Sequence, residues 1–232
     1  CEISSTRRVQ GLGRHQRQAL LKEFEIPAHQ KRGRLLVLSG PGGVGKSSVA
    51  RALRDTPGFW VSVSATTRAP RFNEIDGVDY FFFSNEEFDE AIKAGHFLEW
   101  AQVHGHFYGT SKPWIESQMQ AGSDVMLEID WQGAQQIRKL IPSVQWIFIF
   151  PPSIEALEER LRKRGQDDEA TIERRLAAAH IELTHAHEAD YIVVNDSFDQ
   201  ALVDLKHILA SSRLRSGPSM ARNPALLKRL GV

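Results

Sequence analysis

Short apolar runs alternate with amphipathic stretches along most of the chain. The run "RLLVLS" (34–39) is apolar throughout, which is typical of a strand buried on both faces of a parallel sheet. Apolar residues at helical spacing follow it in "KSSVARALRD" (46–55). Further strands are predicted at 58–64, 79–84, 124–130, 144–150 and 190–196, a hairpin at 96–110, and further helices at 85–95, 112–122, 153–164, 169–187 and 197–212. This order predicts an α/β fold, with a parallel sheet core, helices on both faces and an inserted mixed α+β segment near 66–122.

The two ends of the chain differ from this regular middle. "HQRQALLKEF" (15–24) has apolar residues at helical spacing and predicts a short helix, whereas "SGPSMARNP" (216–224) has the composition of an irregular tail. Both ends are basic: residues 1–34 contain eight Lys or Arg and three acids, and residues 213–232 contain five and none. Solvated tails, or tails that lie on the acidic body, are the simpler interpretation, and contact with nucleic acid is the alternative.

The remaining composition excludes several classes of protein. The single cysteine, Cys1, rules out an internal disulfide and a four-cysteine zinc site, and it favours a reducing, cytoplasmic setting. The sequence has no signal-peptide pattern and no apolar run of ~18 residues, so we expect no membrane contact. The nine histidines show no spacing that is typical of a metal site. We therefore expect an ordinary globular domain.

The stretch "GPGGVGKS" matches the full pattern G-x-x-x-x-G-K-[ST] of a phosphate-binding loop, between a predicted strand and a predicted helix. Its backbone N–H groups and the helix N-terminus would cradle phosphate oxygens. Lys46 is expected to reach the β- and γ-phosphates of a nucleoside triphosphate, and Ser47 is expected to bind the Mg²⁺ that accompanies them. The predicted ATP-binding residues of this loop are Gly40, Pro41, Gly42, Gly43, Val44, Gly45, Lys46, Ser47 and Ser48.

A second charged segment, "SATTRAPRFNEIDGVDYFF", lies downstream of the loop. Arg68 and Arg71 flank a proline that restricts the backbone, and two neighbouring guanidinium groups suit a phosphate dianion. The carboxylates of Glu74, Asp76 and Asp79 suit either proton transfer or a solvated loop, and their spacing favours the loop. A second phosphate site beside a triphosphate site indicates phosphoryl transfer between nucleotides.

Seven motifs follow one another over roughly 35–210: "GPGGVGKS", "SATTRAPR", "DGVDYFF", "FLEWAQVHGHFYGT", "EIDWQGA", "FPPS" and "RLRKRG…RRLAAAHIEL". In this order they resemble the guanylate kinase family, which transfers the γ-phosphoryl group of ATP to GMP. The resemblance implies a P-loop NTPase fold with an inserted GMP-binding subdomain and a helical lid. It also implies Mg²⁺ as cofactor, GMP or dGMP as acceptor, and a part in purine nucleotide metabolism.

The resemblance implies roles for single residues of the acceptor site. The phosphate of GMP would be bound by Ser64, Arg68, Arg71, Tyr80 and Tyr108, with Glu74 orienting the arginines. The guanine base would be read by Glu99, Thr110 and Asp130, with Glu128 on the same strand as Asp130. A carboxylate accepts both the N1–H and the exocyclic NH₂ of guanine, whereas adenine would leave it unpaired, at a cost of ~1–3 kcal/mol or more. Glu99 is therefore the predicted selector of the base.

Other implied residues lie toward the C-terminus. Arg164 and Arg175 match the arginines of the family's lid, which closes over the phosphates and keeps water away. Arg160 either joins them or packs on the adenine, and Asn195 either lies near the adenine or simply ends a strand. Charge stabilisation needs no protein nucleophile. The predicted catalytic residues are Lys46, Arg68, Arg164 and Arg175, and Arg160, Arg164 and Asn195 complete the predicted ATP site.

The resemblance also predicts the boundaries of the parts. They are a basic N-terminal extension at 1–33, a guanylate kinase-like domain at 34–212 and a basic C-terminal tail at 213–232. Within the domain they are a core at 34–65 and 123–212, an acceptor insertion at 66–122 and a lid at about 160–176.

Two other functions share part of this pattern. A peptide-binding scaffold domain of the same fold has a degraded phosphate loop, whereas Gly45, Lys46 and Ser47 are intact here. A kinase for another acceptor, such as a sugar phosphate, would not need Glu99 and Asp130 together with two tyrosines. Both are therefore less favoured than the guanylate kinase.

Overall fold

A computed structural model describes residues 32–231 of the protein, except 55, 57, 104, 166 and 213 and the side chains of 218, 221 and 222. The helix predicted at 15–24, the extension up to residue 31 and Cys1 lie outside the described residues. The described residues form two compact units. Ser62–Ser117 make the smaller one, and 32–61 with 118–231 make the larger one.

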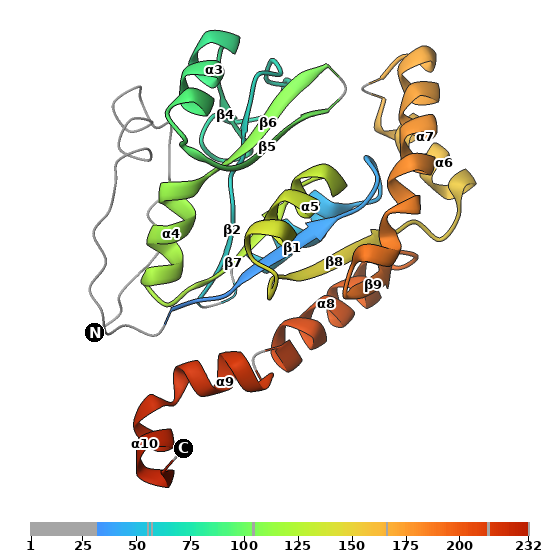
Figure 1. The fold of residues 1–232 in the computed structure, drawn as a ribbon. Helices are drawn as coiled ribbons and strands as arrows, with labels where there is room; N and C mark the ends of the chain where they lie inside the picture. The colour runs from blue at the N-terminus through green and yellow to red at the C-terminus, as the bar shows by residue number, and fades with distance from the viewer. Residues whose placement is uncertain are drawn as a thin grey trace, which may run out of the picture. The chain divides into compact units, whose positions relative to one another are not determined.

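The larger unit is built on a five-stranded sheet in which every neighbouring pair of strands is parallel (Figure 1). The order across the sheet is β2 (Phe59–Val61), β7 (Asp124–Glu128), β1 (Leu35–Ser39), β8 (Gln145–Phe150) and β9 (Tyr191–Val194). The central strand β1 is buried over its whole length, which explains its continuous apolar sequence. Because the strands are parallel, the loops that follow them emerge at one edge of the sheet.

Helices pack against both faces of this sheet. One face shares a core with α2 (Lys46–Leu53), α6 (Ile154–Arg164), α7 (Glu169–Thr184) and α8 (Phe198–Ser212). Leu36 and Leu38 of β1 point into that core, so Leu35 and Val37 point to the other face. There α5 (Trp131–Leu140) contacts β1 and buries Ala134 and Ile137. The sequence-based prediction of a parallel sheet with helices on both faces is confirmed.

Two helical segments were not predicted from the sequence. Helix α5 was missed because "WQGAQQIRKL" has few apolar residues and a glycine at its start, although Asp130 caps it. The stretch predicted as an irregular tail instead forms α9 (Ser216–Arg222) and α10 (Pro224–Leu230). Pro224 at the first position and Gly231, at φ 73°, begin and end α10. Among the described residues, no helix is long and apolar enough to cross a membrane.

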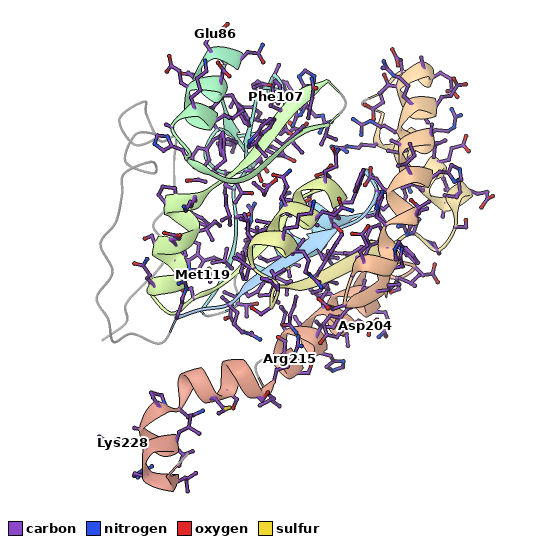
Figure 2. All side chains as sticks on the ribbon, viewed as in Figure 1. Glu86, Phe107, Met119, Asp204, Arg215 and Lys228 are labelled. Carbon is purple, nitrogen blue, oxygen red and sulfur yellow. The ribbon has the colours of Figure 1, made fainter. Side chains whose placement is uncertain are left out.

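The smaller unit combines a mixed sheet with helix α3 (Asn85–Lys93), and α4 (Lys112–Gln120) leads from it into the larger unit. The order in the sheet is β4 (Phe81–Phe82), β3 (Ala65–Thr66), β6 (His106–Ser111) and β5 (Phe97–Val103). The predicted hairpin is confirmed as β5 and β6. Phe88 of α3 stacks on Phe97 and Phe107, while Glu86 of the same helix is exposed (Figure 2). The sheet and α3 thus share a small aromatic core.

A carboxylate is buried in the larger unit. Glu182 of α7 is 9% exposed. Burial raises the pKa of Glu182 to about 7; the charge of Lys46 opposes this rise, and the charge of Asp130 adds to it. The folded protein therefore binds this proton more tightly than the unfolded chain, in which the pKa is near 4.5.

We predict that Glu182→Gln makes the protein more stable at pH 8 and removes a pH dependence. Between pH 4.5 and about 7, the free energy of unfolding of the wild type falls as the pH rises. The loss is at most about 3 kcal/mol, at about 1.4 kcal/mol per pKa unit. Urea unfolding at pH 5, 6, 7 and 8 measures it, with exposed Glu173→Gln on the same helix as control. If the free energy of unfolding of the wild type does not fall relative to that of Glu182→Gln between pH 5 and 8, the prediction is wrong.

Candidate functional site

The phosphate loop joins β1 to α2 and has no room for side chains at two of its glycines. Gly40 and Gly45 have φ angles of 139° and 100°, in the region that favours glycine. A Cβ atom on Gly40 would lie 2.4 Å from the carbonyl oxygen of Ile149 in β8. A Cβ atom on Gly45 would lie 2.5 Å from Nδ2 of Asn195, just after β9. Both the backbone conformation and the neighbours therefore require glycine at these positions.

Lys46 begins α2, and its ammonium group folds back over the loop. It donates to the carbonyl oxygen of Gly40 and, at 3.0 Å, to that of Pro41. Among the described residues, no side chain caps the start of α2. The first N–H groups of a helix carry partial positive charge and need acceptors, so this helix start and the ammonium group together suit an anion.

Ser47, the next residue, contacts the end of β7. Its Oγ donates to Oε1 of Glu128 at 2.5 Å. Hydroxyl and carboxylate oxygens are the kind of ligand that Mg²⁺ prefers, so this pair fits the ion expected beside the phosphates. Glu128 was predicted to bind GMP, and in the structure its carboxylate contacts Ser47, the last residue of the phosphate-loop motif.

Asn195 and Arg160, both expected to bind ATP, bond to the protein itself. Asn195 is 6% exposed, and its Nδ2 donates to the carbonyl oxygen of Val44 at 2.7 Å. Arg160 of α6 donates from Nη2 to the carbonyl oxygen of Asn195 at 2.8 Å. These two bonds connect α6 and the end of β9 to the phosphate loop, and so they hold the loop against the sheet.

The predicted lid arginines lie in different surroundings. Arg164 is exposed at the end of α6. Arg175 of α7 is mostly buried, and its Nη2 lies 3.3 Å from Oδ1 of Asp167. Arg162 pairs at the surface with Glu158 and Glu169. The arginines of α6 and α7 thus differ in exposure and in partners.

In the smaller unit, Glu74 connects the two arginines of the second charged segment. Its Oε1 accepts from Nη2 of Arg68 at 2.8 Å and lies 3.5 Å from Nη1 of Arg71. Its Oε2 accepts from the backbone N–H of Arg71 at 2.8 Å. Burial alone would raise the pKa of Glu74, but these bonds outweigh burial and lower it below 4.5. An ionised carboxylate therefore orients both guanidinium groups, as the sequence suggested for Glu74.

Arg68 also lies against aromatic rings. Its guanidinium carbon is 5.3 Å from the ring centre of Tyr80, and the rings of Tyr80 and Tyr108 meet edge to face at 6.0 Å. Burial works to lower the pKa of Arg68, but the interactions with Glu74 and Tyr108 outweigh it and raise the pKa. The structure thus brings together the arginines and both tyrosines that were predicted to bind the acceptor phosphate.

The other polar residues of this segment bond to backbone. Asp76 accepts from the N–H of Phe82, and Asp79 accepts from the N–H of Ile75, each at 3.0 Å. The carbonyl oxygen of the buried Ser64 accepts from the N–H of Phe81 at 2.9 Å. The two aspartates therefore shape the turn that leads into β4, which supports their interpretation as loop residues.

Glu99 and Thr110 face each other across the β5–β6 hairpin and are 4% and 0% exposed. Oγ1 of Thr110 donates to Oε1 of Glu99 at 2.5 Å. Asp130, the third residue expected to read the base, belongs to the larger unit. It caps α5 by accepting from the N–H of Gly133 at 2.9 Å. Of these three residues, the structure brings Glu99 and Thr110 into contact.

Two further acidic residues near the site were not singled out from the sequence. Glu182 interacts electrostatically with Lys46, and Asp167 contacts Arg175. Glu182 follows Ala179 by three residues on the apolar stripe of α7, a position at which a carboxylate is unusual. The sequence has no corresponding signal for Asp167, because Asp168 and Glu169, which follow it directly, are acidic as well.

Comparison with known proteins agrees with this geometry. A family model described as guanylate kinase matches residues 32–212. The guanylate kinase of Hahella chejuensis is 52% identical over 198 residues, which cover 85% of this chain and 95% of that protein. The guanylate kinase of Idiomarina loihiensis is 49% identical over 201 residues, which cover 85% of this chain and 96% of that protein.

A solved structure extends the similarity to the fold. The crystal structure of guanylate kinase from Anaplasma phagocytophilum matches with a TM-score of 0.71 and 33% sequence identity, over 88% of this chain and 98% of that one. The phosphate loop, the paired arginines and these matches lead to the same conclusion: the chain belongs to the guanylate kinase family.

Proposed function

We propose the residues with which this chain carries out the reaction of its family. As a guanylate kinase it is an ATP:GMP phosphotransferase, which converts ATP and GMP to ADP and GDP. The buried contact of Glu99 with Thr110 is the observation that carries the choice of GMP among nucleoside monophosphates. Because the proposed contacts reach the base and the phosphate and not the ribose, dGMP is a second acceptor.

In the ATP-binding part, the backbone amides of the phosphate loop and Lys46 hold the β- and γ-phosphates. The fold of the loop, with Lys46 already turned over it, supports this role. Phosphoryl transfer needs positioning and charge stabilisation and no covalent intermediate on the protein. Lys46, Arg164 and Arg175 therefore stabilise the charge on the transferred group. Asn195 and Arg160 support the loop from behind and so contribute to ATP binding indirectly.

Ser47 and Glu128 would hold the Mg²⁺ of the nucleotide. Their 2.5 Å contact brings a hydroxyl and a carboxylate together beside the loop, which supports this assignment over base reading for Glu128. Mg²⁺ bound there would neutralise charge on the phosphate oxygens. Ser47 and Glu128 would orient it, and the other ligands would come from the nucleotide and water.

In the acceptor part, Arg68 and Arg71 bind the phosphate of GMP, and Tyr80, Tyr108 and Ser64 add hydroxyl donors. The shared counter-ion Glu74 supports this proposal, because it orients both guanidinium groups before the phosphate arrives. The base is read by Glu99, which accepts from the N1–H and NH₂ of guanine, and Thr110 fixes the orientation of the carboxylate. Asp130 contributes a further acceptor.

The organisation of the whole chain remains part of the proposal. The acceptor insertion spans 66–122, within the guanylate kinase-like domain at 34–212, and the lid spans about 160–176. We place the enzyme in the cytoplasm, since it uses ATP and the only cysteine is Cys1. The basic ends are solvated in this proposal, and nucleic-acid binding is the less favoured alternative.

We predict that the wild type strongly prefers GMP and that Glu99→Gln removes most of its activity. The amide would place an NH₂ donor against the donors of guanine, so kcat/KM for GMP falls by about 100-fold or more. A coupled assay with GMP, AMP, CMP and UMP at equal concentration measures this, with exposed Glu86→Gln of the same unit as control. Comparable turnover of AMP and GMP by the wild type would refute base selection.

We predict that Arg71→Ala weakens the binding of GMP far more than the binding of ATP. Loss of a charged hydrogen bond to phosphate should raise KM for GMP by about 10- to 100-fold and leave KM for ATP nearly unchanged. Steady-state kinetics with each substrate varied in turn make the comparison. Lys93→Ala, an exposed cation on α3, is the control and should change neither constant. An equal loss for both substrates would mean that the segment is not an acceptor site.

We predict that Glu128→Gln and Ser47→Ala each raise the Mg²⁺ concentration needed for half-maximal activity by about tenfold. Calorimetry of ATP binding with and without Mg²⁺ should show that these variants lose the Mg²⁺-dependent part of the affinity. Exposed Glu159→Gln on α6 is the control. A raised KM for GMP with unchanged Mg²⁺ dependence in Glu128→Gln would instead assign Glu128 to the base.

A further inference from the structure

Three consecutive acidic residues, 167–169, lead into the start of α7, and the first of them is turned inward. The side chain of Asp167 is 7% exposed. Asp168 instead caps α7 at the surface by accepting from the N–H of Thr171 at 2.8 Å, and Glu169 pairs with Arg162 at the surface. Burial of a carboxylate is costly unless a cation faces it. For Asp167 that cation is Arg175, about two turns along α7.

The ion pair of Asp167 and Arg175 leaves hydrogen-bonding capacity unused. It rests on a separation of 3.3 Å between Nη2 of Arg175 and Oδ1 of Asp167. Among the described residues, neither Nε of Arg175 nor Oδ2 of Asp167 has a hydrogen-bond partner, although both atoms are buried. A bidentate contact would engage Nε together with Nη2, which lie on the same edge of the guanidinium group, whereas here only Nη2 faces Asp167. Because Asp167 contacts Nη2 and Nε is buried, Nη1 carries the donors that an incoming oxyanion can reach.

We propose that Asp167 is a positioning residue for Arg175: it holds the guanidinium group from one edge so that the other edge binds the transferred phosphoryl group. The inference rests on the proposed role of Arg175 in charge stabilisation. A long arginine side chain loses much rotamer freedom when it engages a phosphate, and a buried counter-ion imposes part of that order before the substrate binds. Asp167 also compensates the charge of the buried guanidinium group while no phosphate is present.

A double-mutant cycle on kcat tests this positioning role. Asp167→Asn keeps the shape and removes the charge, and we expect kcat to fall by about tenfold or more with KM for GMP within about twofold. Arg175→Ala should lower kcat at least as far. In the Arg175→Ala background, Asp167→Asn should have no further effect, because the residue through which it acts is gone.

The neighbouring Asp168 supplies a matched control. Asp168→Asn changes the same charge one residue away and keeps a good helix cap, so kcat should not change. Asp167→Glu, which keeps the charge, should recover part of the lost kcat and gives a second test if Asp167→Asn unfolds. Thermal unfolding of each variant separates loss of folding from loss of rate.

Each outcome of the cycle decides a different point. Additive losses in the double variant, or unchanged kcat in Asp167→Asn, overturn the positioning role while the proposed role of Arg175 stands. Unchanged kcat in Arg175→Ala overturns the role of Arg175 and the inference with it. Three results together support the inference. Asp167→Asn lowers kcat, Asp167→Glu restores part of it, and Asp167→Asn has no further effect in the Arg175→Ala background.

Discussion

The backbone of the phosphate loop is the constraint on which the larger unit depends. Gly40 and Gly45 adopt positive φ angles and lie so close to β8 and to Asn195 that side chains would collide with them. The neighbouring elements must therefore be placed to suit the loop. The amide of Asn195 donates to the carbonyl oxygen of Val44, and the guanidinium group of Arg160 donates to the carbonyl oxygen of Asn195. These two bonds connect the end of β9 and helix α6 to the loop. The phosphate site is thus rigid before nucleotide binds.

A second principle links the charged groups of both units. Arg68 and Arg71 share Glu74, and Arg175 faces Asp167. Partly buried guanidinium groups need a counter-charge, because an unpaired charge in a low-dielectric setting is costly. The carboxylates supply it, and they also limit the orientations that the arginines can take. The arginines proposed to bind phosphate are thereby paired and oriented without it.

The sequence predicted the main architecture because its signals are local. Continuous apolar runs indicated the parallel strands, and the hairpin and most helices followed from periodicity. Helix α5 was missed because its apolar stripe is short, although Asp130 begins it with a side-chain cap. The C-terminal helices were missed because Gly, Pro and Asn suggested a loop, whereas proline at a helix start and glycine just past a helix end are compatible with helix.

For the site, the sequence by itself determined the phosphate loop, because glycine spacing acts on the local backbone and leaves few other conformations. It also identified the two arginines around Pro70, and the resemblance to the family singled out Glu99 and Thr110 of the hairpin. Only the tertiary structure decided that Glu128 contacts Ser47, that Asn195 supports Val44, and that Asp167 rather than Asp168 faces Arg175. The first two contacts join residues 81 and 151 positions apart, and the third depends on which carboxylate the turn before α7 directs inward. These partners are set by the packing of parallel strands and helices, which no local pattern encodes.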